Sequence, residues 1–150
     1  MHYYIKLLGW KDHPMRFMDE WYQTMVTKRM VHATLTQEVT TAGEGDKFVL
    51  FCIANRFTDI VGGGFVGIDN VLGSFQRDPN PLYSKWCYFH DVSLDFVVPL
   101  DRLLPLKEVR GWSGKSPALA KALRENLRWR PLREITKTDY ERFESELKRR

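Results

Sequence analysis

The spacing of hydrophobic and polar positions predicts a chain rich in strands. Five runs have a strand pattern: residues 3–8, 31–36, 47–54, 65–75 and 86–98. Residues 47–54 follow a turn at Gly43–Asp46 and are apolar almost throughout, which is typical of a central strand covered on both faces. Residues 86–98 alternate most clearly and stop at Pro99, because proline cannot donate a hydrogen bond to a sheet ladder.

Apolar side chains have helical spacing in three other stretches: residues 12–25, 116–127 and 138–147. Asp12 and Ser116 can cap the first two helices, and Pro14 and Pro117 suit their first turns. Thr138-Asp139-Tyr140-Glu141 has the form of a capping box at the start of the third helix.

The order of these elements is strand, helix, several strands and then two helices, which lacks the regular strand–helix alternation of a parallel sheet. It predicts an α+β fold, a small, curled, mostly antiparallel β-barrel flanked by helices. The 150 residues contain no repeat, linker or low-complexity tract, so we expect a single domain over residues 1–150.

Composition narrows the class of protein. Hydrophobic residues make up 43% and charged residues 28%, which is too apolar for a disordered chain. The first residues are too polar for a signal peptide and no stretch is long enough to span a membrane, so we expect a cytoplasmic protein. Cys52 and Cys87 lie in apolar runs and are expected to be buried free thiols. The four histidines are scattered, and no metal or cofactor is expected.

Two glycine-containing motifs fail on context. Residues 62–67 match GxGxxG, but they join two strands, whereas a dinucleotide-binding fingerprint runs from a strand into a helix. Gly114-Lys115-Ser116 lacks the earlier glycine of a phosphate-binding P-loop, since Val109 stands in its place. Asp91 and Asp95 share one face of a predicted strand, but no third group completes a catalytic site.

The positive charge is local. Between Arg110 and Arg133 the chain has seven basic residues and one acid, a net charge of +6, whereas the whole chain carries +4. Trp112 and Trp129 lie within the same segment. Basic side chains neutralise phosphates and indole rings stack on exposed bases, so the segment predicts a nucleic-acid partner. Its candidate contacts to the nucleic-acid backbone are Lys115, Lys121, Arg124, Arg128, Arg130 and Arg133.

Five segments add a resemblance to a known family. They are Gly45–Phe51, Gly64–Ile68, Phe89–Phe96, the proline- and leucine-containing residues 98–106, and Ile135–Phe143. Their order and spacing resemble the EVE domains of the PUA-like superfamily, which are related to YTH domains, over about residues 44–147. The chain departs from that pattern at Leu8-Gly9-Trp10, where these domains have Ser-Glu-Pro, and at residues 27–30, which lack their Arg-Asn.

The resemblance implies a curled barrel that takes one modified base, flipped out of its stack, into an aromatic pocket. Trp21 and Trp112 are the first candidates for the pocket walls, followed by Trp10 and Trp129. Asn55, at the end of the central strand, is the candidate reader of the base edge.

The resemblance also implies a module without catalysis, which would act through an effector protein such as a nuclease or an RNA-processing enzyme. Three alternatives stay open: a general RNA-binding module of PUA type, a small nuclease or base-processing hydrolase that uses Asp91 or Asp95, and a binder of small molecules such as free nucleosides. The choice between DNA and RNA, the base modification and the oligomeric state stay open as well.

Overall fold

The computed structural model describes residues 1–8, 28–32, 37–52, 63–81, 86–124 and 132–150. Its strands are β1 (Tyr3–Leu8), β2 (Arg29–His32), β3 (Lys47–Cys52), β4 (Gly64–Val71), β5 (Gln76–Arg77), β6 (Tyr88–Val97), β7 (Leu104–Pro105) and β8 (Leu132–Ile135). Its helices are α2 (Gln37–Thr41), α3 (Leu106–Ser113), α4 (Pro117–Arg124) and α5 (Lys137–Lys148), with a 3-10 turn at Leu100–Arg102.

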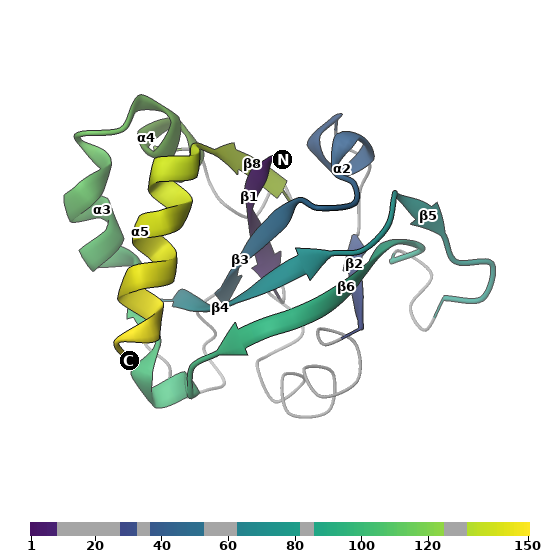
Figure 1. The fold of residues 1–150 in the computed structure, drawn as a ribbon, viewed down its shortest axis with the longest axis horizontal. Coiled ribbons are helices and arrows are strands. Elements are labelled where there is room, and N and C mark those ends of the chain that lie inside the picture. Colours follow the sequence, from purple (N-terminus) through teal and green to yellow (C-terminus); the bar gives the residue numbers. More distant parts are fainter. Residues whose placement is uncertain (9–27, 33–36, 53–62, 82–85, 125–131) are drawn as a thin grey trace.

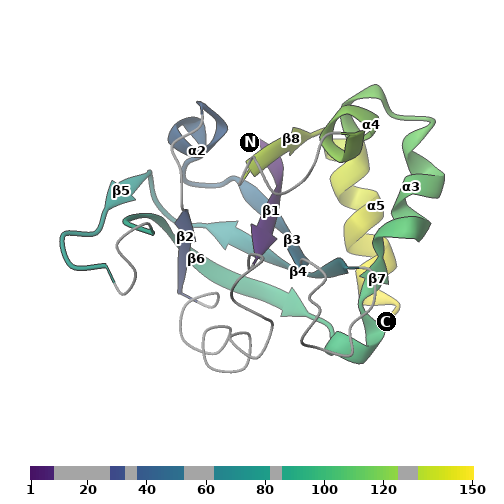
Figure 2. The same ribbon diagram turned by 180° about the vertical axis from the view of Figure 1, so that it is seen from behind.

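The strands form one curled sheet, and α3, α4 and α5 gather at one end of it (Figure 1). The main strand order is β2-β6-β4-β3-β1-β8, while β5 pairs with β6 and β7 with β4. β1 and β3 run parallel, and the other described pairs are antiparallel. Seen from behind, β2 and β8 lie at the two edges of the curl (Figure 2). The predicted α+β fold, a curled and mostly antiparallel barrel flanked by helices, is confirmed as a half-barrel.

Strand positions agree best where the apolar pattern is strongest. β1 has the predicted bounds, and β3 and β6 fall within the predicted runs, because buried strands leave a clear signal. β4 ends at Val71 rather than residue 75. β2 spans Arg29–His32, and residues 33–36 of its predicted run lie outside the described residues. The predicted helix over residues 12–25 also lies outside them.

Six of the described elements were not predicted: the helices α2 and α3, the strands β5, β7 and β8, and the 3-10 turn. The capping box of α5 also lies two residues earlier than predicted, because Thr136 and not Thr138 is the N-cap. Thr136 Oγ1 accepts a hydrogen bond from the backbone of Asp139, and the Asp139 carboxylate accepts one from the backbone of Thr136.

One carboxylate connects the starts of two helices. Ser116 caps α4 as predicted, since its Oγ accepts a hydrogen bond from the backbone N–H of Leu119 at 3.3 Å. The same hydroxyl donates to Asp139 Oδ2 at 2.9 Å, in the first turn of α5. The 94% buried Asp139 therefore fixes α4 and α5 against each other.

Different side chains fill the two ends of the half-barrel. At the helical end, α5 packs on β4 through Phe143, whose ring centroid lies 4.5 Å from that of Phe65. At the other end, the buried ring of Phe48 on β3 lies edge-on to the rings of His32 and His90. The second end is thus lined by polar groups as well as by apolar ones.

Gly67 provides a direct test of the strand packing. It pairs with Val97 beside an irregularity in the β4–β6 register, and a Cβ atom at this position would lie 2.5 Å from the carbonyl oxygen of Phe96. We expect Gly67→Ala to lower the free energy of unfolding by about 1–3 kcal/mol, since the clash is with backbone. Urea denaturation measures this loss. Gly43→Ala is the matched control, because a Cβ there meets no atom within 4 Å; equal stability of the two variants would contradict the packing.

Candidate nucleic-acid interface

A groove of about 540 Å³ lies between α4, β8, the start of α5 and the first residues of the chain. Its lining consists of Met1, His2, Tyr3, Glu38, Ala118, Lys121, Ala122, Arg133, Glu134, Ile135, Thr136 and Lys137. Two of these residues, Lys121 and Arg133, belong to the predicted contacts with a nucleic-acid backbone. The fold therefore brings part of the basic segment to a concave surface.

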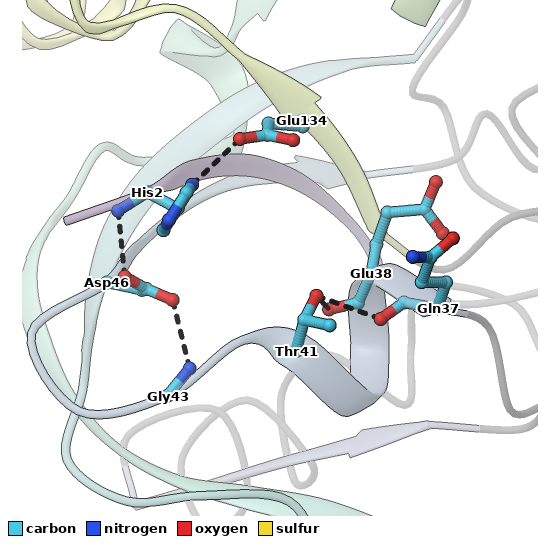
Figure 3. Close-up of polar contacts among 7 residues, drawn as sticks. All are labelled: His2, Gln37, Glu38, Thr41, Gly43, Asp46 and Glu134. Atoms are coloured by element: carbon cyan, nitrogen blue, oxygen red, sulfur yellow. Dashed lines mark hydrogen bonds and ion pairs between the residues drawn. The ribbon is translucent and has the colours of Figure 1, made fainter.

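A buried aspartate fixes one wall of this groove (Figure 3). Asp46 Oδ1 accepts a hydrogen bond from the backbone N–H of His2 at 2.8 Å, and its Oδ2 accepts one from the N–H of Gly43 at 2.9 Å. The imidazole Nδ1 of His2 lies 2.8 Å from Glu134 Oε1 on β8. The turn before β3, the start of β1 and β8 are thereby held in one arrangement.

Two lysines on the lining of the groove are exposed. Lys121 is exposed on α4 and Lys137 begins α5. Lys137 Nζ is 3.7 Å from Glu141, but both side chains are more than half exposed, so this pair adds little stability and leaves the ammonium accessible. Glu38 and Glu134 lie on the same lining. The two lysines can attract an anion to part of the groove. The two glutamates disfavour an anion, so the attraction is not uniform over the lining.

Arg133 was predicted to contact the nucleic-acid backbone, but the structure buries its side chain. It is only 5% exposed, and its Nη1 donates a hydrogen bond to the carbonyl oxygen of Ala122 at 2.7 Å. The physical reason is that residues 132–135 form β8, so the Arg133 stem lies against α4. The side chain ties β8 to α4 and forms part of the wall of the groove rather than its exposed rim.

Trp112 is the predicted pocket wall that lies within the described residues. It is half-buried on α3, where its ring packs against Phe143 at 5.5 Å between centroids. The guanidinium carbon of Arg142 lies 4.5 Å from the indole ring, a cation–π contact. In this arrangement the indole belongs to the contact between α3 and α5, and its part in a base pocket stays a prediction.

Most of the other predicted site residues are not described by the structure. Trp10, Trp21, Asn55, Arg128, Trp129 and Arg130 lie outside the described residues. Lys115 is exposed after the end of α3, and Arg124 is the last residue of α4. Roles for all of these residues stay predictions.

A buried chain of hydrogen bonds was not found from the sequence. His32 on β2 and His90 on β6 are both 0% exposed, and His32 Nε2 lies 2.8 Å from His90 Nδ1. His90 Nε2 in turn lies 2.9 Å from the carbonyl oxygen of Ala42. Alternation along residues 86–98 does place His90 on a face with Val92, but its pairing with His32 depends on the β2–β6 register.

Burial determines the charge state of these imidazoles. It lowers the pKa of His32 well below the ordinary value, and the nearby Lys6 and His90 lower it further. Burial also lowers the pKa of His90, again helped by Lys6, although the hydrogen bond with Ala42 and the charges of Asp46 and Asp91 act in the opposite direction. Both rings are therefore neutral near pH 7.

Lys6 and Asp69 are also ionisable groups buried in the half-barrel. Lys6 on β1 is 1% exposed, and burial lowers its pKa to about 7. Asp69 on β4 is 0% exposed and pairs in register with Phe48, and burial raises the pKa of its carboxyl group to about 8. Burial therefore favours the neutral forms of both groups.

The described residues include two thiols but no cluster of metal ligands and no membrane-spanning helix. Within them, no three His, Cys, Asp or Glu side chains are placed to hold a metal ion. No described helix is long and apolar enough to cross a membrane. Cys52 is buried and Cys87 half-buried, and both are free thiols. Burial raises the pKa of the Cys52 thiol, which makes it a poor nucleophile.

Comparison with known proteins adds a likeness in structure. No protein-family model matches the sequence, and no curated protein matches it significantly. Solved structures match over nearly the whole chain. A protein from Pseudomonas putida has 12% identity and a TM-score of 0.63, over 97% of this chain and 99% of that chain. Human THYN1, solved in complex with DNA containing 5-methylcytosine, has 12% identity and a TM-score of 0.61, over 97% and 98%. The DUF55 domain of human thymocyte nuclear protein 1 has 12% identity and a TM-score of 0.60, over 96% and 98%.

At such low identity the likeness concerns the fold. The chain has the fold of these solved structures, the DUF55 domain among them. The chain therefore has the PUA-like fold of EVE domains, as the resemblance of its segments implied.

Proposed function

We propose that this protein binds nucleic acid and reads one modified base, flipped out of its stack, while basic side chains hold the phosphates. The observation that carries the proposal is the likeness, over 97% of the chain, to a protein solved with DNA containing 5-methylcytosine. A flipped base costs a few kcal/mol of lost stacking and pairing, which contacts inside the protein must offset. A curled sheet with polar groups in its interior can provide such contacts.

The distribution of charge supports the same proposal. The segment from Arg110 to Arg133 has a net charge of +6, and within it Lys115 and Lys121 are exposed. Lys137 adds a further accessible cation beside Lys121 at the groove. A concave surface with cations on one side can follow a phosphate backbone, since each neutralised phosphate releases condensed counterions.

We propose further that the protein does not itself catalyse a reaction and acts through an effector protein such as a nuclease or an RNA-processing enzyme. The hydrolase alternative depends on Asp91 and Asp95. Asp91 accepts a hydrogen bond from Gln76 Nε2 at 3.2 Å, which gives it a structural part in joining β5 to β6. Turnover of an oligonucleotide that is lost in Asp91→Asn would overturn this part of the proposal.

A binding titration at two salt concentrations tests the proposed function. The ligands are matched DNA and RNA oligonucleotides, either plain or with methylated or hydroxymethylated cytosine or methylated adenine. We expect a preference for one modified base that persists at the higher salt concentration, because base contacts are less sensitive to salt than phosphate contacts. Equal binding to all ligands would reduce the function to electrostatic attraction, and no binding would overturn it.

The two lysines of the groove allow a sharper prediction. We expect the double variant Lys121→Ala/Lys137→Ala to reduce the slope of log Kd against log salt by about 1.5–2, since each lost phosphate contact removes about 0.9. The preference for the modified base should remain. The matched control is Lys107→Ala/Lys148→Ala, which loses the same charge at exposed positions outside the groove. Equal slopes for the two double variants would show that the groove does not contact phosphates.

A further inference from the structure

The curl of the sheet brings side chains of β1 and β2 together although these strands do not pair. β2 is an edge strand bonded to β6, whereas β1 pairs with β3 and β8. The Phe48 ring bridges them, with centroid distances of 6.1 Å to Tyr4 on β1 and 6.4 Å to His32 on β2. We call this region, with Lys6, His32, Phe48 and His90, the seam. No described backbone hydrogen bonds join β1 to β2 here, so side chains determine what the seam can bind.

The hydrogen-bond chain at the seam assigns a proton position to each ring. The carbonyl oxygen of Ala42 can only accept, so His90 Nε2 carries the hydrogen. A neutral His90 then has a lone pair on Nδ1, and His32 Nε2 must donate to it. His32, also neutral, is left with a lone pair on Nδ1. The chain therefore ends in a hydrogen-bond acceptor.

This terminal acceptor is buried and has no hydrogen-bond partner among the residues that the structure describes. A buried polar atom without a partner costs about 1–3 kcal/mol, and such atoms in native proteins require an explanation. An apolar side chain in place of His32 would not remove this cost, because His90 Nδ1 would then be the buried acceptor without a donor. The explanation we favour is that Nδ1 accepts a hydrogen bond from a bound molecule.

We propose that the seam forms part of the base site and that His32 Nδ1 accepts a hydrogen bond from the exocyclic amino group of the flipped base. This inference rests on the proposed function and narrows its substrate class to bases with an amino group, such as cytosine or adenine derivatives. A 4-oxo pyrimidine would turn an oxygen lone pair toward Nδ1 and be disfavoured.

The surroundings of the seam favour a neutral donor over a cation. Lys6 is buried on β1, and in its charged form it lowers the pKa of both imidazoles, whereas Asp46 and Asp91 raise the pKa of His90. A positively charged group would meet the same repulsion and the same desolvation cost. Because Nδ1 is covered in this structure, a base reaches it only when the groups that cover it move. β2 spans four residues and His32 is its last, so the acceptor lies at the end of a short edge strand.

The test compares 5-methylcytosine with thymine, a pair of bases that share the methyl group but differ in the amino and oxo groups at position 4. Each is placed opposite an abasic site, so that neither has a pairing partner to lose. We expect the wild-type protein to bind the 5-methylcytosine duplex at least about ten-fold more tightly than the thymine duplex. In His32→Phe the two affinities should agree to within about two-fold. Met30→Leu, a volume-conserving change on the same strand, should keep the wild-type ratio.

A second measurement covers the case in which His32→Phe does not fold. Long-range proton–nitrogen spectra of the wild-type protein report the protonation of each ring nitrogen. We expect both rings to be protonated on Nε2, and the Nδ1 resonance of His32 to shift with the 5-methylcytosine duplex but not with the thymine duplex. An unshifted resonance, or a His32→Phe variant with the wild-type affinity ratio, overturns the inference but leaves the proposed function standing. A wild-type protein that binds no modified duplex in preference to a plain one overturns the proposed function itself.

Discussion

Replacing Lys6 with methionine is expected to raise the free energy of unfolding at pH 7 by about 2–4 kcal/mol. Lys6 is 1% exposed on β1, and methionine has a similar unbranched shape without an ammonium group. The folded state must keep Lys6 neutral or bury its charge, whereas the unfolded chain exposes a charged lysine to water. Removing this cost outweighs the small change in packing.

The pH dependence of stability shows whether the buried ammonium group causes the gain in Lys6→Met. The pKa of Lys6 falls from 10.5 in the unfolded chain to about 7 in the folded protein. Between these values the unfolded state binds more protons, so the Lys6 contribution to wild-type stability rises as the pH rises from 7 to 10.5. A pKa change of this size corresponds to at most about 5 kcal/mol. The advantage of Lys6→Met should therefore shrink steadily toward pH 10.

Urea denaturation at pH 7, 8.5 and 10 measures this effect. Lys107→Met is the control, because Lys107 is exposed on α3 and its replacement should change stability by less than about 0.5 kcal/mol at each pH. A destabilised Lys6→Met protein, or one whose advantage is the same at all three pH values, would contradict the explanation. A stabilised variant that has lost its preference for a modified base would show that the lysine serves binding at the expense of stability.

The elements that the sequence predicted well are those with one dominant local signal. The run at residues 47–54 is apolar on both faces, and β3 lies within it because a covered strand has no polar face to interrupt the pattern. β8 shows the opposite case. Leu132–Ile135 contains Arg133 and Glu134, so the strand is hidden within a basic segment and only its pairing with β1 reveals it.

The candidate site was less predictable because it joins segments that are distant in the chain. The groove combines residues 1–3 with residues 118–122 and 133–137, and no local pattern relates these ranges. The hydrogen bond between His32 and His90 likewise depends on the register of β2 against β6. The local positive charge did predict Lys121 as a contact. The same charge could not show that Arg133 is buried, because burial depends on the fold.

The carboxyl group of Asp69 should produce the opposite pH dependence to that of Lys6. Its pKa rises from 3.8 in the unfolded chain to about 8 in the folded protein, because burial disfavours the charged form. Between these values the folded state holds a proton that the unfolded state releases, so the Asp69 contribution to stability falls as the pH rises from 4 to 8. Asp69→Asn keeps the shape and removes the titration. We expect the variant to gain about 3–5 kcal/mol over the wild-type protein between pH 4 and pH 8.

Urea denaturation across this range compares Asp69→Asn with Asp95→Asn, which changes an exposed carboxylate on β6. The stability of Asp95→Asn should follow that of the wild-type protein, whereas the curve of Asp69→Asn should diverge from it as the pH rises. Parallel curves for all three proteins would show that the folded state accommodates the Asp69 charge. Because Lys6 acts above pH 7 and Asp69 below pH 8, the two replacements affect nearly separate ranges. If the double variant loses both slopes of stability against pH, then Lys6 and Asp69, the two buried groups inside the half-barrel, cause this pH dependence.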